Sequence, residues 1–228
     1  MDLFPAPAIP RLTVLNSDDT IPVNRVFCVG RNYWAHAAEM NGEVERDAPF
    51  YFTKSHHAVV GGGEIPFPPG TENYHHEFEL SFVLGTGGKD IDADDAISHI
   101  WGWCAGLDMT RRDLQNYAKE KRLPWDTSKD IPAGAVLGPV TPAADWTLGT
   151  QRMHLSVNGE IRQDAHVNEL IWSVPEIIAH LSRLYTLTPG DVVMTGTPAG
   201  VGPVGPGDVL EGEIDGLAPI KTTIGAPT

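Results

Sequence analysis

The residues from His76 to Leu84 alternate apolar and polar side chains more regularly than any other stretch, and this period of two restricts the local backbone to an extended strand. One face carries four apolar residues: Phe78, Leu80, Phe82 and Leu84. The other carries three polar residues: Glu77, Glu79 and Ser81. We therefore expect a half-buried strand.

The rest of the chain is divided into short segments by 24 glycines and 19 prolines, which favours strands and turns over helices. Asn158-Gly159 predicts a hairpin between strands at 153–157 and 160–163. Further strands are expected at 12–15, 26–29, 100–107, 192–195, 209–214 and 220–224. Short helices are expected at 32–40, 92–99 and 110–121, and one after the capping box Ser173–Glu176, stopped by Gly190. We therefore expect an α+β fold that is mainly β.

Length and charge limit the organisation and the partners. A chain of 228 residues fits one large domain, residues 25–228, after a short proline-rich segment, residues 1–24. The net charge of −14 argues against nucleic acid, which requires a basic surface. With no signal peptide, no membrane-length apolar run and two cysteines in apolar runs (Cys28 and Cys104), we expect a cytoplasmic protein with buried thiols.

Three acidic residues are candidate ligands of a metal ion. Glu77 and Glu79 project from the same face of a strand with Cα atoms about 6.5–7 Å apart, although a solvated face is the commoner reason for such a pair. Asp108 ends a nearly all-apolar strand, where it either binds a cation or caps the next helix, a role that Thr110 could take instead. Carboxylates gathered together repel unless a cation lies between them, and oxygen ligands suit Mg²⁺, Mn²⁺ or Ca²⁺. His75 and His76 are adjacent, point to opposite faces and are poor co-ligands.

Two further groups could carry chemistry. His36 and Glu39 are three residues apart on the expected short helix, so the carboxylate could hold the imidazole as a general base, although a casual surface contact is commoner. Lys129 lies in a stretch without periodicity, where a lysine is usually just solvated. Gly200–Gly205 matches a dinucleotide-binding string, but it opens no helix and is rejected as such a site.

Several strings in order resemble the fumarylacetoacetate hydrolase family from about residue 25 to 217. They are Val29-Gly-Arg-Asn-Tyr33 with His36 and Glu39, His76-Glu-Phe-Glu-Leu80, Gly106-Leu-Asp108 with Arg111-Arg-Asp-Leu-Gln115, and Thr195-Gly-Thr-Pro-Ala-Gly200. The resemblance implies a homodimeric, mixed β-roll of the C-terminal-domain type. It implies Mg²⁺ or Mn²⁺ on Glu77, Glu79 and Asp108, and His36, Glu39 and Lys129 as catalytic residues. Substrate-binding positions fall at Arg31, Tyr33, Gln115 and Thr197.

The activity implied is hydrolysis of a carbon–carbon bond in a 2,4-dioxo acid, an acylpyruvate such as fumarylpyruvate, to pyruvate and a carboxylic acid. We expect His36 to activate water, Lys129 to stabilise the oxyanion and Thr197 to bind the substrate carboxylate. Pro124–Thr127 and His75-His76 resemble members that act in gentisate breakdown. Oxaloacetate decarboxylation and 2-hydroxy-diene-dioate isomerisation use the same metal-enolate chemistry. A catalytically silent metal-binding protein is the other alternative, because Asp130-Ile-Pro132 replaces the family's Phe-Asp element after the lysine.

Overall fold

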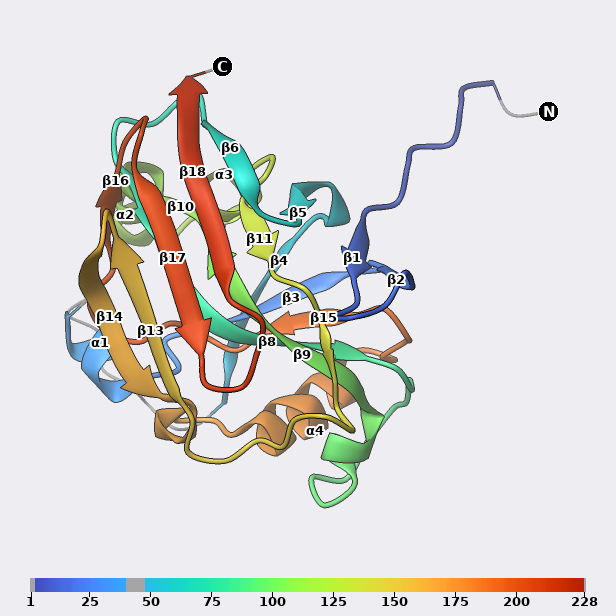
Figure 1. The fold of residues 1–228 in the computed structure, drawn as a ribbon. Helices are drawn as coiled ribbons and strands as arrows, with labels where there is room; N and C mark the ends of the chain where they lie inside the picture. The colour runs from blue at the N-terminus through green and yellow to red at the C-terminus, as the bar shows by residue number, and fades with distance from the viewer. Residues whose placement is uncertain (1–2, 40–47, 228) are drawn as a thin grey trace.

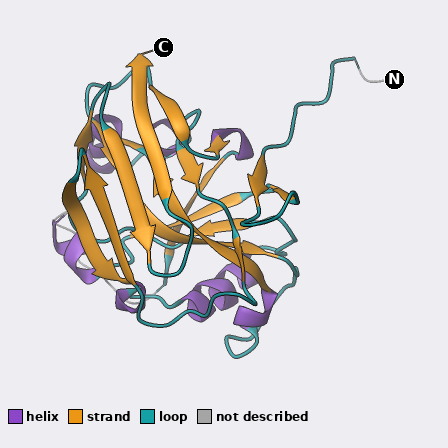
Figure 2. Ribbon diagram, in the orientation of Figure 1, coloured by secondary structure: helices purple, strands orange, loops and turns teal. Residues whose placement is uncertain are grey.

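A computed structural model describes residues 3–39 and 48–227, without the side chains of residues 37–39. Strands dominate and helices lie at the periphery (Figure 2), so the mainly β, mixed fold expected from the sequence is confirmed. No helix in these ranges is long and apolar enough to cross a bilayer.

The larger of two main sheets has eight strands and carries the candidate acids. Its order is β4-β3-β15-β8-β9-β11-β5, with β12 also paired to β9. β3 pairs with β15 and β5 with β11 in parallel, while β8 and β9 are antiparallel. The strands are β3 (Val26–Gly30), β4 (Phe50–Lys54), β5 (Val59–Val60), β8 (Phe78–Leu84), β9 (Ile100–Asp108), β11 (Ala135–Leu137), β12 (Thr141–Pro142) and β15 (Val192–Met194).

The second main sheet has five strands in the order β14-β13-β17-β18-β6. They are β6 (Gly63–Phe67), β13 (Arg152–Val157), β14 (Glu160–His166), β17 (Val209–Ile214) and β18 (Ile220–Pro227). Asn158 and Gly159 connect β13 to β14 with φ of 55° and 80°, the left-handed values of the predicted hairpin turn.

The main hydrophobic core lies where these two sheets meet, and in Figure 1 the five-stranded sheet stands to the left of the eight-stranded one. Phe78 and Leu80 of β8 belong to this core together with Leu210 and Ile214 of β17. The sheets approach closely at Gly212, where an added Cβ would lie 2.4 Å from the Phe78 ring. A glycine is therefore needed at this crossing.

Smaller elements complete the fold. β7 (Tyr74–His76), β10 (Thr110–Arg111) and β16 (Gly202–Val204) form a three-stranded sheet, and β1 (Arg11–Thr13) pairs with β2 (Thr20–Pro22). The N-terminal segment is not isolated, because Leu12 and Val23 join a second core cluster with Val26 and Cys28. The helices are α1 (Trp34–Glu39), α2 (Arg112–Lys121), α3 (Asp126–Lys129) and α4 (Val174–Leu184), with 3-10 turns η1 (His56–Ala58), η2 (Ala96–His99) and η3 (Val167–Glu169).

The structure corrects three local expectations. The strand at 76–84 is not half-buried: every residue of β8 is buried, because the second core cluster, which includes Val83, covers its other face. The helix expected from Asp92 is only the 3-10 turn η2. α4 begins with the predicted capping box but ends at Leu184, well before Gly190. Both cysteines are buried free thiols, as expected.

Candidate metal centre and adjoining cleft

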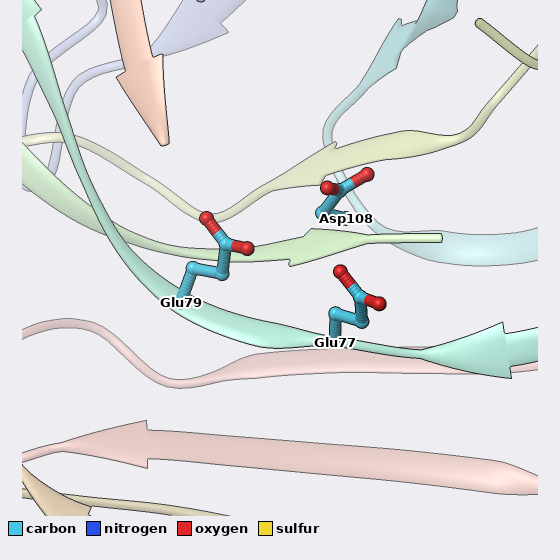
Figure 3. A group of neighbouring side chains, drawn as sticks. All are labelled: Glu77, Glu79 and Asp108. Carbon is cyan, nitrogen blue, oxygen red and sulfur yellow. The ribbon is translucent and has the colours of Figure 1, made fainter. Parts of the chain in front are cut away.

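Three buried carboxylates converge at one end of the β8–β9 pair (Figure 3). Glu77 immediately precedes β8, Glu79 is its second residue, and Asp108 is the last residue of β9. Antiparallel pairing sets Phe78 opposite Leu107 and so brings the three acids together. Their ligand oxygens lie within 4.8 Å of one another, and the residues are 5%, 2% and 0% exposed, so the solvated-face alternative is wrong.

Three cationic side chains contact two of these acids. The Lys129 ammonium donates to Glu77 Oε2 and to Asp108 Oδ2, each at 2.7 Å, and to the Thr110 hydroxyl at 2.7 Å. The Arg112 guanidinium pairs with Glu77. The Lys54 ammonium lies 2.8 Å from Asp108 Oδ1, an ionic contact without hydrogen-bond geometry.

Neither Asp108 nor Thr110 caps the following helix. α2 begins at Arg112, and the residue at its N-cap position, Arg111, makes no side-chain capping bond. The Thr110 hydroxyl donates to the carbonyl of Asp108, while both Asp108 oxygens face lysines. The capping alternative for Asp108 is therefore wrong, and its carboxylate belongs to the acidic cluster.

Glu79 lies in a different electrostatic setting from its neighbours. Its Oε2 accepts a hydrogen bond from the Gly196 N–H at 2.8 Å, but among the described residues no lysine or arginine pairs with it. Burial, followed by the charges of Asp108 and Glu77, raises the pKa of Glu79 well above its ordinary value. Gly196 is required for this contact, since its φ is +103° and an added Cβ would lie 2.7 Å from the Asn32 Cβ.

For Glu77 and Lys129 the surroundings favour the charged form, in contrast to Glu79. Burial acts to raise the pKa of Glu77, but the adjacent Lys129 and Arg112 cations outweigh it and hold that pKa below its ordinary value. Burial acts to lower the pKa of Lys129, but Asp108 and Glu77 outweigh it and raise that pKa. Glu77 and Lys129 are therefore held ionised, and Glu79 is the carboxylate of the three with which no described lysine or arginine forms an ion pair.

This donor set fits a hard divalent cation. All three candidate ligands offer carboxylate oxygens, which Mg²⁺ and Mn²⁺ prefer, and their spacing allows one ion to contact all three. A cation there would also supply the charge that Glu79 lacks. The two adjacent histidines are not part of the group: His76 Nδ1 bonds to Gln163 Oε1 and His75 Nε2 to Asn73 Oδ1.

A small cavity of about 20 Å³ adjoins the acids, and a larger one of about 630 Å³ lies beside it. Besides the acids, the small cavity is lined by His36, Gln115 and Thr197. The two cavities share five lining residues: Arg31, Phe52, Lys119, Trp125 and Lys129. The larger volume falls in the range of small-molecule sites, roughly 300–1,000 Å³. A substrate in the cleft would therefore reach the acids.

The structure brings most predicted site residues to these cavities. His36 is buried against the small cavity, and Glu39 ends α1, but the Glu39 side chain lies outside the described part of the chain. Lys129 reaches the acids despite the altered segment that follows it. Gln115 accepts a hydrogen bond from Arg112. The Thr197 hydroxyl donates to the Phe78 carbonyl and accepts from Gln163, so its hydrogen is already engaged.

Tyr33 departs from its predicted place. Its hydroxyl donates to Met153 Sδ at 3.1 Å and lies 3.4 Å from the His166 carbonyl. Its ring lines a separate cavity with Trp34 and Leu170 instead of either cavity at the acids. The geometry therefore does not support a substrate contact for Tyr33.

Three residues that sequence reasoning did not single out complete the site. Lys54 and Arg112 neutralise Asp108 and Glu77. Gln163 accepts from the Phe78 N–H and donates to Thr197 and to the Pro198 carbonyl, which ties β14 to the loop after β15. Arg112 lies inside one of the strings that carry the family resemblance, whereas Lys54 and Gln163 carry no signal in the sequence.

Comparison with known proteins gives consistent matches across the chain. The family model for the fumarylacetoacetate (FAA) hydrolase C-terminal domain matches residues 25–225. A fumarylpyruvate hydrolase from Ralstonia sp. is 47% identical over 177 residues, covering 77% of this chain and 92% of that protein. A mitochondrial oxaloacetate decarboxylase from Dictyostelium discoideum is 40% identical over 196 residues, covering 85% of this chain and 89% of that protein. The crystal structure of fumarylpyruvate hydrolase from Pseudomonas aeruginosa, with Mn²⁺ and pyruvate, has a TM-score of 0.96 at 44% identity, covering 99% and 100% of the two chains.

Proposed function

Because the chain belongs to the fumarylacetoacetate hydrolase C-terminal family, we propose that it hydrolyses a carbon–carbon bond in an acylpyruvate such as fumarylpyruvate, giving pyruvate and a carboxylic acid. The observation that carries the proposal is the cluster of Glu77, Glu79, Asp108 and Lys129 at the inner end of a substrate-sized cleft. A relative with the same fold holds Mn²⁺ and pyruvate. The sequence resembles family members that act in gentisate breakdown, so the reaction would serve the catabolism of aromatic compounds.

Glu77, Glu79 and Asp108 would hold Mg²⁺ or Mn²⁺. The ion, when bound, supplies a Lewis-acid charge for the oxygens of the pyruvyl end of the substrate. Arg31 and Gln115 would orient that end, an assignment supported by their position in the wall of the small cavity.

The protein's own groups move the proton and hold the developing charge. His36 takes a proton from the attacking water, and Glu39 is assigned to orient its ring. The water oxygen bonds to the distal carbonyl carbon, and the carbon–carbon bond then breaks with its electron pair on the pyruvyl fragment, which takes up a proton. Lys129 would stabilise the oxyanion, a contribution of about 3–4 kcal/mol for one donor. All three hydrogens of its ammonium are engaged by Glu77, Asp108 and Thr110, so it must exchange one partner for the substrate oxygen.

The direct test is incubation of the purified protein with Mn²⁺ or Mg²⁺ and fumarylpyruvate. We expect loss of the enol absorbance with stoichiometric pyruvate, and abolition of both by His36→Ala while Mn²⁺ still binds. Absence of pyruvate from every acylpyruvate tested would contradict the proposal and favour a silent metal-binding protein.

Oxaloacetate decarboxylation is the second candidate, because a decarboxylase at 40% identity shares most of the chain. The same protein should be assayed for carbon dioxide release from oxaloacetate. Release faster than acylpyruvate cleavage would assign the site to decarboxylation. His36→Ala separates the two further, since only hydrolysis requires an activated water.

A homodimer is part of the proposal. Its support beyond the family resemblance is β14, an edge strand of the five-stranded sheet that exposes Ile161. Light scattering coupled to size-exclusion chromatography should give twice the mass of the chain. A monomer at micromolar concentration would contradict it.

A further inference from the structure

The larger cavity combines cationic and aromatic side chains in a protein that is strongly acidic overall. Among the described residues that line it, three cations besides Lys129, namely Arg31, Lys119 and Arg122, stand beside a single acid, Asp126. The protein as a whole carries a net charge of −14. The cleft is therefore locally positive on a negative molecule, an arrangement that favours an anionic ligand.

Lys119 and Arg122 lie on one side of this cavity, at the C-terminal end of α2. Lys119 borders both cavities, whereas Arg122 borders only the larger one. A ligand that extends from the acids into the cleft therefore meets Lys119 first and Arg122 farther out. The Lys119 ammonium lies over the Trp125 ring, 5.3 Å from its centroid, so an aromatic side chain and a cation adjoin in the cavity wall.

The backbone at Arg122 is a second, independent observation. Arg122 ends α2 in the left-handed conformation, with φ of 56° and ψ of 42°, where its N–H bonds back to the Ala118 and Lys119 carbonyls. This position ordinarily favours glycine. Arg31, also in the cavity wall, has φ of 59°. Left-handed residues are common at helix C-termini, and here this ending of α2 holds the Arg122 backbone at the cavity wall.

Two neighbouring arginines outweigh the one nearby carboxylate, Glu77, in their effect on the pKa of Lys119. Partial burial, followed by the Arg112 guanidinium, lowers the pKa of Lys119 to about 8, and Arg31 acts in the same direction. A carboxylate beside its ammonium would favour the charged form.

We propose that Lys119 and Arg122 bind a second carboxylate, at the acyl end of the substrate, so that the cleft selects acylpyruvates with an anionic, planar tail. This inference rests on the proposed function for the pyruvyl end. It assigns to these two side chains a specificity role that is separate from the acids, His36 and Lys129.

The kinetic test compares fumarylpyruvate, which carries the distal carboxylate, with acetylpyruvate, which lacks it. Lys119→Met keeps the apolar stem, and Arg122→Asn keeps a residue that tolerates the left-handed conformation. Each should lower kcat/KM for fumarylpyruvate roughly 10- to 200-fold, mainly through KM, with little change for acetylpyruvate. Lys121→Met removes the same charge from the same helix outside the cavity and should change neither. Equal losses on both substrates would overturn the proposal.

A binding measurement tests the carboxylate site independently of catalytic activity. Fumarate and crotonate share a planar skeleton and differ in the second carboxylate, and titration calorimetry on the Mn²⁺-loaded protein measures both. Wild type and Lys121→Met should bind fumarate more tightly than crotonate, and Lys119→Met and Arg122→Asn should lose the difference. If no acylpyruvate is cleaved but this pattern holds, the hydrolase proposal fails and the carboxylate site stands. If the variants bind fumarate as wild type does, the carboxylate site is wrong.

Discussion

At the scale of single residues, Lys54 is a buried cation that connects a candidate metal ligand to the backbone of the site. It is 2% exposed, and its ammonium contacts Asp108 Oδ1 and the backbone carbonyls of Met109 and Lys129. One side chain therefore fixes both a candidate metal ligand and the backbone of the candidate catalytic lysine. Its role is to position these groups.

Lys54→Met should be strongly destabilising because it leaves Asp108 with one buried charge partner fewer. We expect a loss of roughly 3–5 kcal/mol in the free energy of unfolding, measured by urea denaturation. Lys221→Met, at an exposed pair with Glu211, should cost less than about 1 kcal/mol. Combining Lys54→Met with Asp108→Asn should recover part of the loss, and strict additivity of the two changes would contradict the assigned contact.

Glu79 should make the stability of the metal-free protein fall as pH rises above the ordinary range of a carboxyl group. Its folded-state pKa is raised, so its contribution to stability is fully present below its unfolded pKa and is lost as pH rises through the folded value. In EDTA, the Tm of Glu79→Gln minus that of wild type should grow as pH rises, each 1 kcal/mol being worth roughly 2–4 °C. A difference independent of pH would show that Glu79 is not buried among like charges. The same variant should bind Mn²⁺ more weakly.

The residues of the site differ in how far the sequence reveals them. Glu77 and Glu79 are accessible to prediction because a strand places alternate residues on one side, and Asp108 because a carboxylate ending an apolar strand is costly. Lys54 and Gln163 reach the site from distant segments, and their local sequence resembles that of any surface lysine or strand glutamine. Their roles depend on tertiary contacts, which no local pattern records.

At the scale of elements, the crossing of β8 and β17 depends on Gly212. An added methyl group would lie 2.4 Å from the Phe78 ring, in the layer between the two sheets. Phe78 also pairs with Leu107 of β9, so its backbone cannot move freely.

Gly212→Ala should therefore cost roughly 1–3 kcal/mol, the usual penalty of overpacking, measured by thermal or urea unfolding. Gly61→Ala is the matched control, because a Cβ added there would have nothing within 4 Å and the φ of Gly61 is ordinary. A stability of Gly212→Ala equal to that control would contradict the close packing of the sheets.

The elements with a strong local signal form where predicted. The Asn158-Gly159 hairpin and the Ser173–Glu176 capping box are examples, since each is fixed by a few neighbouring residues. The environment predicted for β8 is wrong. Its polar alternation is that of a half-exposed strand, but the polar face is covered by other segments and filled by charged partners. Only the assembled fold distinguishes a buried polar face from a solvated one.

At the scale of the whole molecule, the metal should act on stability as well as on catalysis. The candidate ligands lie on, or directly before, neighbouring central strands of the larger sheet, so an ion bound there favours the folded state over the unfolded one. Mn²⁺ at a hundredfold excess over its dissociation constant should stabilise by about 2.7 kcal/mol. The Tm should rise by roughly 5–10 °C at this chain length.

Scanning calorimetry with and without EDTA measures this shift, and Glu79→Gln should lose most of it. An equal rise in wild type and variant would place the bound ion elsewhere.

The mixed β architecture is predictable chiefly through the ordered motifs of the family. The domain boundary between residues 24 and 25 stays a prediction. The N-terminal strands pack against the main domain, so the structure shows no gap there that would mark a boundary.

The five residues shared by the two cavities separate two groups of residues as well as connecting them. The small cavity holds the residues that any reaction at the pyruvyl end would require, and the larger one holds residues at the end of a helix. Substitutions confined to the larger cavity should therefore change which substrate is accepted and leave the bond-breaking residues intact. New substrate specificities could evolve in such a protein without a change in its catalytic chemistry.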